Sequence, residues 1–158
     1  MRLWKNTAGI LCAGLSFVAL VAAAQGAAAE SGRKAFEREC SDCHMAFPAQ
    51  LMPKRSWHLI TSTLDNHFGE DASLDPDVTK KIQAYLEANA ADTGGRTRGA
   101  LRGIKDSETP VRITEMPWWV GIHKYEVRPS AFKDPRVRSK SNCMACHRGA
   151  KRGNYDDD

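Results

Sequence analysis

The chain lacks a strong net charge, and this absence excludes one large class of functions. Its 158 residues include 23 Lys and Arg against 19 Asp and Glu, a formal charge of +4 at pH 7. Proteins that bind nucleic acid electrostatically carry a clear basic patch or a much larger basic excess. We therefore expect no nucleic-acid partner.

Long apolar runs are also scarce, and the one that matters lies at the start of the chain. It extends from Ala8 to Ala24, follows a basic stretch at residues 1–5, and precedes three alanines at 27–29. This order is typical of a secretory signal peptide. We predict that residues 1–29 are cleaved after Ala29, with the alanines at 22–24 as second choice. The alternative is an uncleaved membrane anchor, for which the run is barely long enough, since a bilayer takes about 20 apolar residues.

Cysteines are few, and their spacing is informative. The first of five, Cys12, lies inside the predicted signal peptide, and the other four form the pentapeptide Cys-x-x-Cys-His at 40–44 and 143–147. Two thiols at this spacing form thioethers with the vinyl groups of a c-type haem, and the histidine coordinates the iron. The sequence therefore predicts two covalent haems, attached at Cys40, Cys43, Cys143 and Cys146, with proximal ligands His44 and His147. Because bacteria attach such haems outside the inner membrane, the motif agrees with export to the periplasm.

Other uses of these cysteines are disfavoured. A four-cysteine zinc site could be built from the two pairs, but each following histidine would then be incidental. A thioredoxin-type redox pair would normally lie in a βαβ pattern, and this pattern is missing. Because the haem sites use every cysteine of the exported chain, we expect no structural disulfide.

Hydrophobic periodicity predicts a mainly α protein of short helices. The spacing favours helices over residues 31–40, 56–68 and 76–86, and a further short helix opened by Pro117. The third of these is the best signalled, because Asp75 can cap it and Pro76 suits its first position. Residues 92–115 combine several Gly and Arg with little periodicity and indicate a linker. We expect an N-terminal haem lobe at 30–91 and, at 92–158, a linker with a largely irregular C-terminal haem lobe.

The second axial ligand of each iron decides what the haem can do. An open position binds gases or peroxide, a methionine raises the reduction potential, and a histidine favours low-spin electron transfer. The candidates are His58, His67, His123, Met45, Met52, Met116 and Met144.

Helix geometry separates His58 from His67. At about 100° per residue, the steps between them place the two rings on opposite sides of a helix. His67 then lies on the apolar stripe as a distal ligand, whereas His58 lies on the polar side as a surface residue and a reserve candidate. His123 is the nearest unassigned histidine to the second haem. Among the methionines, Met116 stays a credible alternative for either haem.

The sequence resembles the dihaem cytochrome c (DHC) family of bacterial periplasmic proteins. The resemblance covers most of the exported chain: CSDCHMAFP at 40–48, HFGEDASL at 67–74, RITE at 112–115, Pro117-Trp118, His123 and the last pentapeptide. It implies a small c-type cytochrome with a class I-like N-terminal lobe. It also implies bis-histidine haems, with His44 and His147 proximal and His67 and His123 distal. We favour His67 for the first haem and His123 for the second, and a crossed pairing stays open.

Two functions are consistent with these features. The first is a periplasmic electron carrier, not an enzyme, whose partners are other redox proteins. By resemblance these include a small oxygen-binding monohaem cytochrome c. We expect a monomer that meets the membrane only through a redox partner. The alternative is a haem enzyme or gas sensor with one five-coordinate haem. It is disfavoured because the histidines suffice for both irons and no acid–base cluster is evident.

Basic side chains offer two further expectations. The stretches 96–105, 133–140 and 148–152 could steer an acidic face of a partner. Arginine suits carboxylates through bidentate hydrogen bonds, so it is the natural residue to bind haem propionates. The candidates for that role are Arg33, Arg96, Arg98 and Arg102.

Overall fold

Four α-helices carry the fold, and the expectation of a mainly α protein is confirmed. The computed structural model describes residues 10–94 and 99–156, and within these ranges no sheet is formed. The helices are α1 (Ile10–Cys40), α2 (Lys54–Ser62), α3 (Pro76–Ala88) and α4 (Pro117–Glu126), joined by loops and short 3-10 turns. Arg96 and Arg98 lie outside the described residues.

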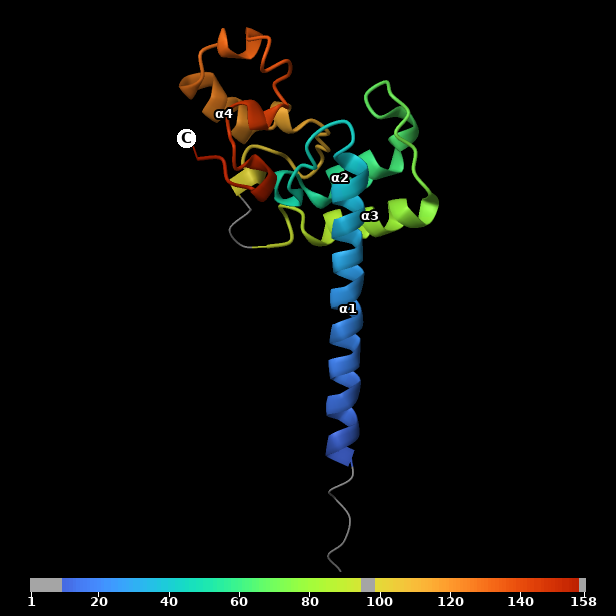
Figure 1. The fold of residues 1–158 in the computed structure, drawn as a ribbon. Coiled ribbons are helices and arrows are strands. Elements are labelled where there is room, and N and C mark those ends of the chain that lie inside the picture. Colours follow the sequence, from blue (N-terminus) through green and yellow to red (C-terminus); the bar gives the residue numbers. More distant parts are fainter. Residues whose placement is uncertain (1–9, 95–98, 157–158) are drawn as a thin grey trace, which may run out of the picture.

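The first helix is much longer than the predicted segment 31–40. It begins at Ile10, and its N-terminal part projects from the body of the molecule as a rod (Figure 1). Alanine has the highest helix propensity, so the alanine-rich segment continues the helix and Ser31 does not cap it. Residues 25–31, around the predicted cleavage site, are all exposed. No helix in the described ranges is both long and apolar enough to cross a membrane.

Helices α1 and α3 cross at a glycine. A Cβ atom built on Gly32 would lie 2.6 Å from the carbonyl oxygen of Lys81 and 2.9 Å from the Cβ of Tyr85. The ring of Phe36, one turn later, packs 5.7 Å from the ring of Tyr85 between centroids. The absence of a side chain at Gly32 therefore lets the two helices approach closely, and any larger residue would push them apart.

Helix α3 begins as the sequence predicts. The Asp75 carboxylate accepts hydrogen bonds from the backbone N–H groups of Asp77 and Val78, at 2.8 and 3.4 Å, and Pro76 occupies the first turn. The buried residues Ile82 and Leu86 belong to its predicted apolar stripe.

Helix α2 ends earlier than predicted, and the expectation of a helix reaching Phe68 is wrong. Thr61, Ser62 and Thr63 turn their hydroxyls back onto carbonyl groups of the preceding turn, at 2.9, 2.7 and 2.9 Å. Such back-bonding competes with the helical ladder, and the α-helix stops at Ser62. A 3-10 turn at Leu64–Asn66 follows, so His67 does not lie on a helix.

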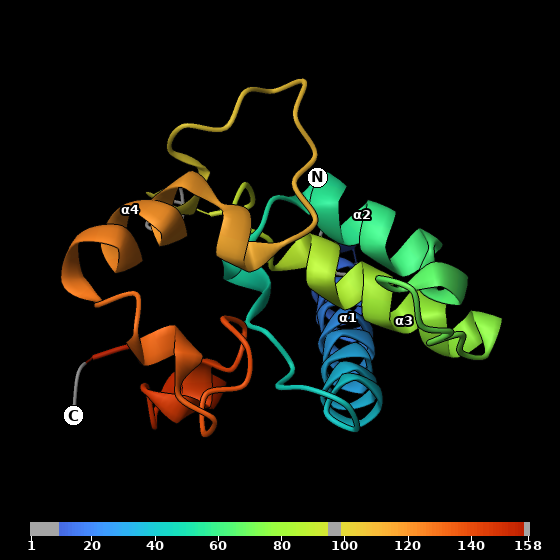
Figure 2. The ribbon, with the colours of Figure 1, turned by 90° about the horizontal axis from the view of Figure 1, so that it is seen from above.

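One hydrophobic core joins the two predicted lobes. It combines residues of α1, α2 and α3 with residues from the end of the linker and from α4; they include Phe36, Trp57, Ile82, Leu86, Ile113, Met116 and Trp119. Seen from above, α2 and α3 lie on one side, and α4 lies with the C-terminal turns on the other (Figure 2). Helix α4, which carries His123, therefore shares its core with the N-terminal helices.

Candidate functional site

The first pentapeptide follows directly from α1. Cys40 is the last residue of that helix and is partly buried, whereas Cys43 is exposed in the turn that follows. Burial raises the pKa of the Cys40 thiol to about 11, and the nearby Glu39 adds to the shift. The end of the helix therefore presents both sulfur atoms on one short turn, as attachment to a single porphyrin requires.

The structure brings His44 and His67 together. Their ring centroids lie 6.0 Å apart, and the angle between the ring planes is 23°. The His44 Nδ1 donates to the carbonyl oxygen of Met45 at 2.7 Å, which leaves its Nε2 as the basic nitrogen. Burial lowers the pKa of His67, and the neighbouring His44 and Arg112 act in the same direction. The His67 ring is thus favoured in the neutral form that binds metals.

A tight turn delivers His67 to this position. The backbone N–H of His67 donates to the Glu70 carbonyl at 2.7 Å, and that of Glu70 returns a bond to His67 at 3.2 Å. The turn needs positive φ angles, 57° at Phe68 and 100° at Gly69. The first is unusual for a residue with a side chain. The guanidinium of Arg112 lies 4.1 Å from the centroid of the Phe68 ring, a cation–π contact that holds this ring in place.

The second histidine pair lies in the C-terminal lobe. His123 on α4 and His147 of the second pentapeptide have ring centroids 6.3 Å apart, with planes at 88°. The His123 Nδ1 donates to the carbonyl oxygen of Trp119 at 2.9 Å, so its Nε2 is again the basic nitrogen. Pro117 opens this helix as predicted, and a 3-10 turn at Cys143–Ala145 carries the second cysteine pair.

The separation within both histidine pairs fits one iron between two rings. A metal–nitrogen bond to histidine is about 2 Å long. Two imidazoles on opposite sides of one metal therefore have centroids about 6 Å apart, once the ring radius is added. The observed values are 6.0 and 6.3 Å.

A cavity beside the first pentapeptide, lined in part by Ser41 and by none of the four histidines, and two buried polar atoms also bear on the fit of a haem. This cavity of about 680 Å³ has walls from α1 and α3 and from the C-terminal turn, including Phe36, Tyr85, Lys151, Arg152 and Tyr155. This volume lies within the range of cofactor sites. The Tyr155 hydroxyl and the Trp118 indole nitrogen are buried and have no hydrogen-bond partner in the described part of the chain. Aromatic side chains beside Lys151 and Arg152 suit a porphyrin that carries two propionates, and Glu37 is the one acidic residue of the same lining.

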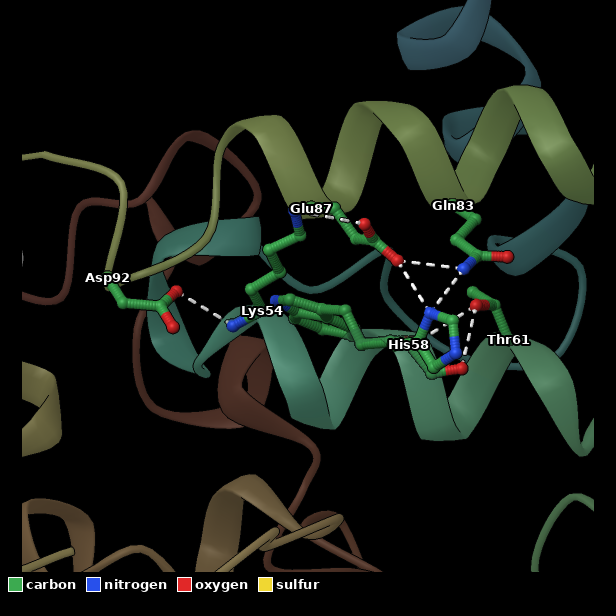
Figure 3. Close-up of polar contacts among 7 residues, drawn as sticks. Lys54, His58, Thr61, Gln83, Glu87 and Asp92 are labelled. Atoms are coloured by element: carbon green, nitrogen blue, oxygen red, sulfur yellow. Dashed lines mark hydrogen bonds and ion pairs between the residues drawn. The ribbon is translucent and has the colours of Figure 1, made fainter. Parts of the chain in front are cut away.

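The remaining ligand candidates lie elsewhere. His58 is at the interface of α2 and α3, where its Nδ1 lies 2.9 Å from a Glu87 carboxylate oxygen and 2.6 Å from the Gln83 amide nitrogen (Figure 3). Its side chain is 63% exposed. The Gln83 hydrogen bond is the main cause that lowers the pKa of Glu87, and His58 and Lys54 contribute. This network ties two helices together and does not include any cysteine of the pentapeptides.

Two of the methionine alternatives are enclosed by protein, whereas Met144 is 41% exposed. Met52 and Met116 are 1% and 0% exposed, and both belong to the hydrophobic core. Among the arginines considered for propionates, Arg33 is already paired with Glu30 and Glu37 along α1, at 2.8 and 2.6 Å. Tyr155 is a candidate that the sequence does not reveal, because a lone tyrosine carries no motif.

These observations define a class. A helical fold with two Cys-x-x-Cys-His motifs, each facing a further histidine, is that of a multihaem c-type cytochrome. A family model described as dihaem cytochrome c matches residues 36–155. The chain belongs to the dihaem cytochrome c family and carries two c-type haems, attached at the cysteines 40/43 and 143/146. Members of this family are usually electron carriers, and c-type cytochromes of bacteria are typically periplasmic.

Solved structures agree with this assignment. The chain is similar to a dihaem cytochrome c from Rhodobacter sphaeroides at 52% identity and a TM-score of 0.71, with 76% of this chain and 94% of that chain covered. A second structure, of DHC purified from the same organism, matches at 48% identity and a TM-score of 0.63, with the same coverage. The dihaem cytochrome from Shewanella baltica OS155 matches at 36% identity and 0.63, over 79% of this chain and 88% of that one. No curated protein matches the chain.

Proposed function

We propose that this protein transfers electrons between redox partners through two bis-histidine haems. His44 and His67 hold the first iron, and His123 and His147 hold the second. The observation that carries the proposal is the pairing of the four rings, with centroids 6.0 and 6.3 Å apart. When bound, each haem supplies an iron that alternates between the ferric and ferrous states.

The protein's own residues hold two of the four imidazoles in the orientation that a ligand needs. Carbonyl groups of Met45 and Trp119 fix the Nδ1–H of His44 and His123, and this leaves the Nε2 of each ring for the metal. If each haem iron is held by two histidines, no coordination site would stay open for a substrate or a gas. This arrangement suits electron transfer rather than catalysis.

For Met52, Met116 and His58, the observed contacts support a structural role rather than ligation of a haem iron. Met52 and Met116 pack in the core, and His58 pairs with Glu87. The proposed pairing is also the direct one, in which each proximal histidine is joined by the nearer distal histidine.

An optical redox titration combined with electron paramagnetic resonance tests this function. We expect two low-spin ferric haems and no binding of carbon monoxide to the reduced protein at neutral pH. A stoichiometric high-spin signal, or carbon monoxide binding to one haem, would instead favour an enzyme or gas sensor with a five-coordinate haem.

Charge is divided unevenly between the two lobes, and this division indicates which lobe binds a redox partner. Residues 30–91 contain seven basic and ten acidic residues, whereas residues 92–158 contain fourteen basic and nine acidic ones. Exposed cations of the C-terminal lobe include Lys133, Lys140, Arg148, Lys151 and Arg152. The C-terminal lobe therefore docks the acidic face of a periplasmic redox partner, a small monohaem cytochrome c being the candidate that the family resemblance provides.

Electron transfer to such an acidic partner should slow as salt is added. A variant with Lys133→Glu and Lys140→Glu should reduce the second-order rate at low ionic strength by about tenfold or more, since steering raises association rates by 10-fold to 1000-fold. Stopped-flow spectroscopy measures this rate. The control is Lys80→Glu and Lys81→Glu on α3, which should change it far less. Equal effects of the two charge reversals would show that the C-terminal lobe is not the docking surface.

A further inference from the structure

The two histidine pairs differ in one geometric respect, the angle between their ring planes. His44 and His67 are close to parallel, at 23°, whereas His123 and His147 are nearly perpendicular, at 88°. The centroid separations are similar. If both pairs bind iron, the two metals have the same ligand types in different orientations.

The plane of His123 is set by Trp119. The two rings are stacked with centroids 4.0 Å apart and planes within 13° of each other. The hydrogen bond from His123 Nδ1 to the Trp119 carbonyl fixes the position of one ring atom. A single hydrogen bond leaves the ring able to pivot about its own axis, whereas a stacked indole removes that freedom. Trp119 is itself buried, at 6% exposure, so it provides a rigid surface.

The first pair is held by different neighbours. The His44 ring is stacked on Phe47, with centroids 5.0 Å apart and planes at 24°. The His67 ring meets the edge of Phe68 at 4.8 Å and 63°. Neither Phe47 nor Phe68 holds its histidine perpendicular to the other histidine, so the ring planes of His44 and His67 stay nearly parallel.

Ring orientation matters because of the electron configuration of low-spin ferric iron. Each imidazole donates π density into the iron d orbital that lies perpendicular to its own plane. When the two rings are aligned, both donate into the same one of the two iron d orbitals of π symmetry and raise its energy above the other. The electron paramagnetic resonance spectrum is then rhombic, with three resolved g values. Crossed rings raise both orbitals equally, so the near-degeneracy gives one very large g value and features too broad to resolve. The energy gap between these two orbitals stabilises the ferric state. Crossed rings remove this gap, so they raise the reduction potential of the haem.

We propose that Trp119 is a positioning residue that holds the His123 ring across His147 and makes the second haem electronically distinct from the first. The second haem then shows the strongly anisotropic low-spin signal and the first the rhombic signal. Reduction of the second haem is favoured by this orientation, and this haem lies in the basic lobe that faces an acidic partner. The inference rests on the proposed bis-histidine ligation.

Electron paramagnetic resonance of the oxidised holoprotein and of three variants tests the inference. The wild type should show one rhombic and one large-g signal. Trp119→Leu should shift the large-g feature to lower g or replace it with a second rhombic signal, and should lower the potential of one haem only. Trp119→Phe keeps a stacking ring and should retain the wild-type spectrum. Phe132→Leu is the matched control, because Phe132 is tilted at 45° to His123 and does not align with its plane.

The possible spectra distinguish a failure of the proposed role of Trp119 from a failure of bis-histidine ligation. Two low-spin rhombic signals in the wild type would leave bis-histidine ligation standing and overturn the inference, as would a large-g signal unchanged by Trp119→Leu. A high-spin signal would overturn both. Should Trp119→Leu fail to fold, His67→Ala decides: its remaining low-spin signal should be the large-g one, and a rhombic remainder would overturn the inference.

Discussion

Replacement of His67 by alanine is expected to convert the first haem from low spin to high spin and to leave the second haem low spin. The His67 ring lies 6.0 Å from that of His44 between centroids, and no other candidate ligand of the described chain is paired with His44 in this way. Loss of the imidazole removes a strong-field ligand, opens a coordination position and raises the potential of that haem. One of the two low-spin signals should therefore disappear, and about one equivalent of carbon monoxide should bind after reduction. His123→Ala should have the same effect on the second haem.

The matched control for these variants is His58→Ala. His58 is a histidine on the neighbouring helix α2, but it pairs with Glu87 and its side chain is 63% exposed. Both low-spin signals should survive its removal, and any cost should appear as a small loss of stability, about 1 kcal/mol or less, as for exposed ion pairs. A high-spin haem in His58→Ala, or two low-spin haems in His67→Ala, would contradict the proposed ligand set.

The second large effect is expected from the double variant Cys143→Ser and Cys146→Ser. Serine forms no thioether with a vinyl group, so the second haem cannot be attached, while the first motif at 40–44 is intact. The intact mass of the exported protein should fall by one haem, and the haem absorbance per protein should fall by half. The first haem should stay low spin, because both of its histidines precede the linker and the helices around them share a core that the substitution does not touch.

A cysteine outside the motifs provides the control for this experiment. Cys12 lies within residues 1–29, which we predict to be removed. Cys12→Ser should therefore give an exported protein with the same mass as the wild type and both haems. A mass that changes with Cys12 would show that the segment is retained. Two haems on the double variant would show that the second pentapeptide is not the attachment site.

Local rules explain which parts of the fold the sequence predicts well. The start of α3 depends on Asp75 and Pro76, whose effects act within one helical turn, and the structure has the expected cap. Pro117 opens α4 for the same reason. The end of α2 was predicted wrongly because periodicity continues to Phe68, while the run Thr61–Thr63 bonds back to the helix and stops it. The helical argument that favoured His67 therefore does not apply, even though the residue it favoured does meet His44.

The amino-acid sequence alone determines the chemistry that needs only a few consecutive residues, such as haem attachment. Two Cys-x-x-Cys-His motifs establish two covalent haems, because thioether attachment and the proximal ligand need only five consecutive residues. Tertiary structure alone decides which distant rings approach each other and at what angle. The partners of His44 and His147 come from a tight turn and from another helix, and the angles of 23° and 88° depend on Phe47 and Trp119 packing against them. Contacts between residues far apart in sequence arise only when the chain packs, and the orientation of a ring follows from the side chains packed around it.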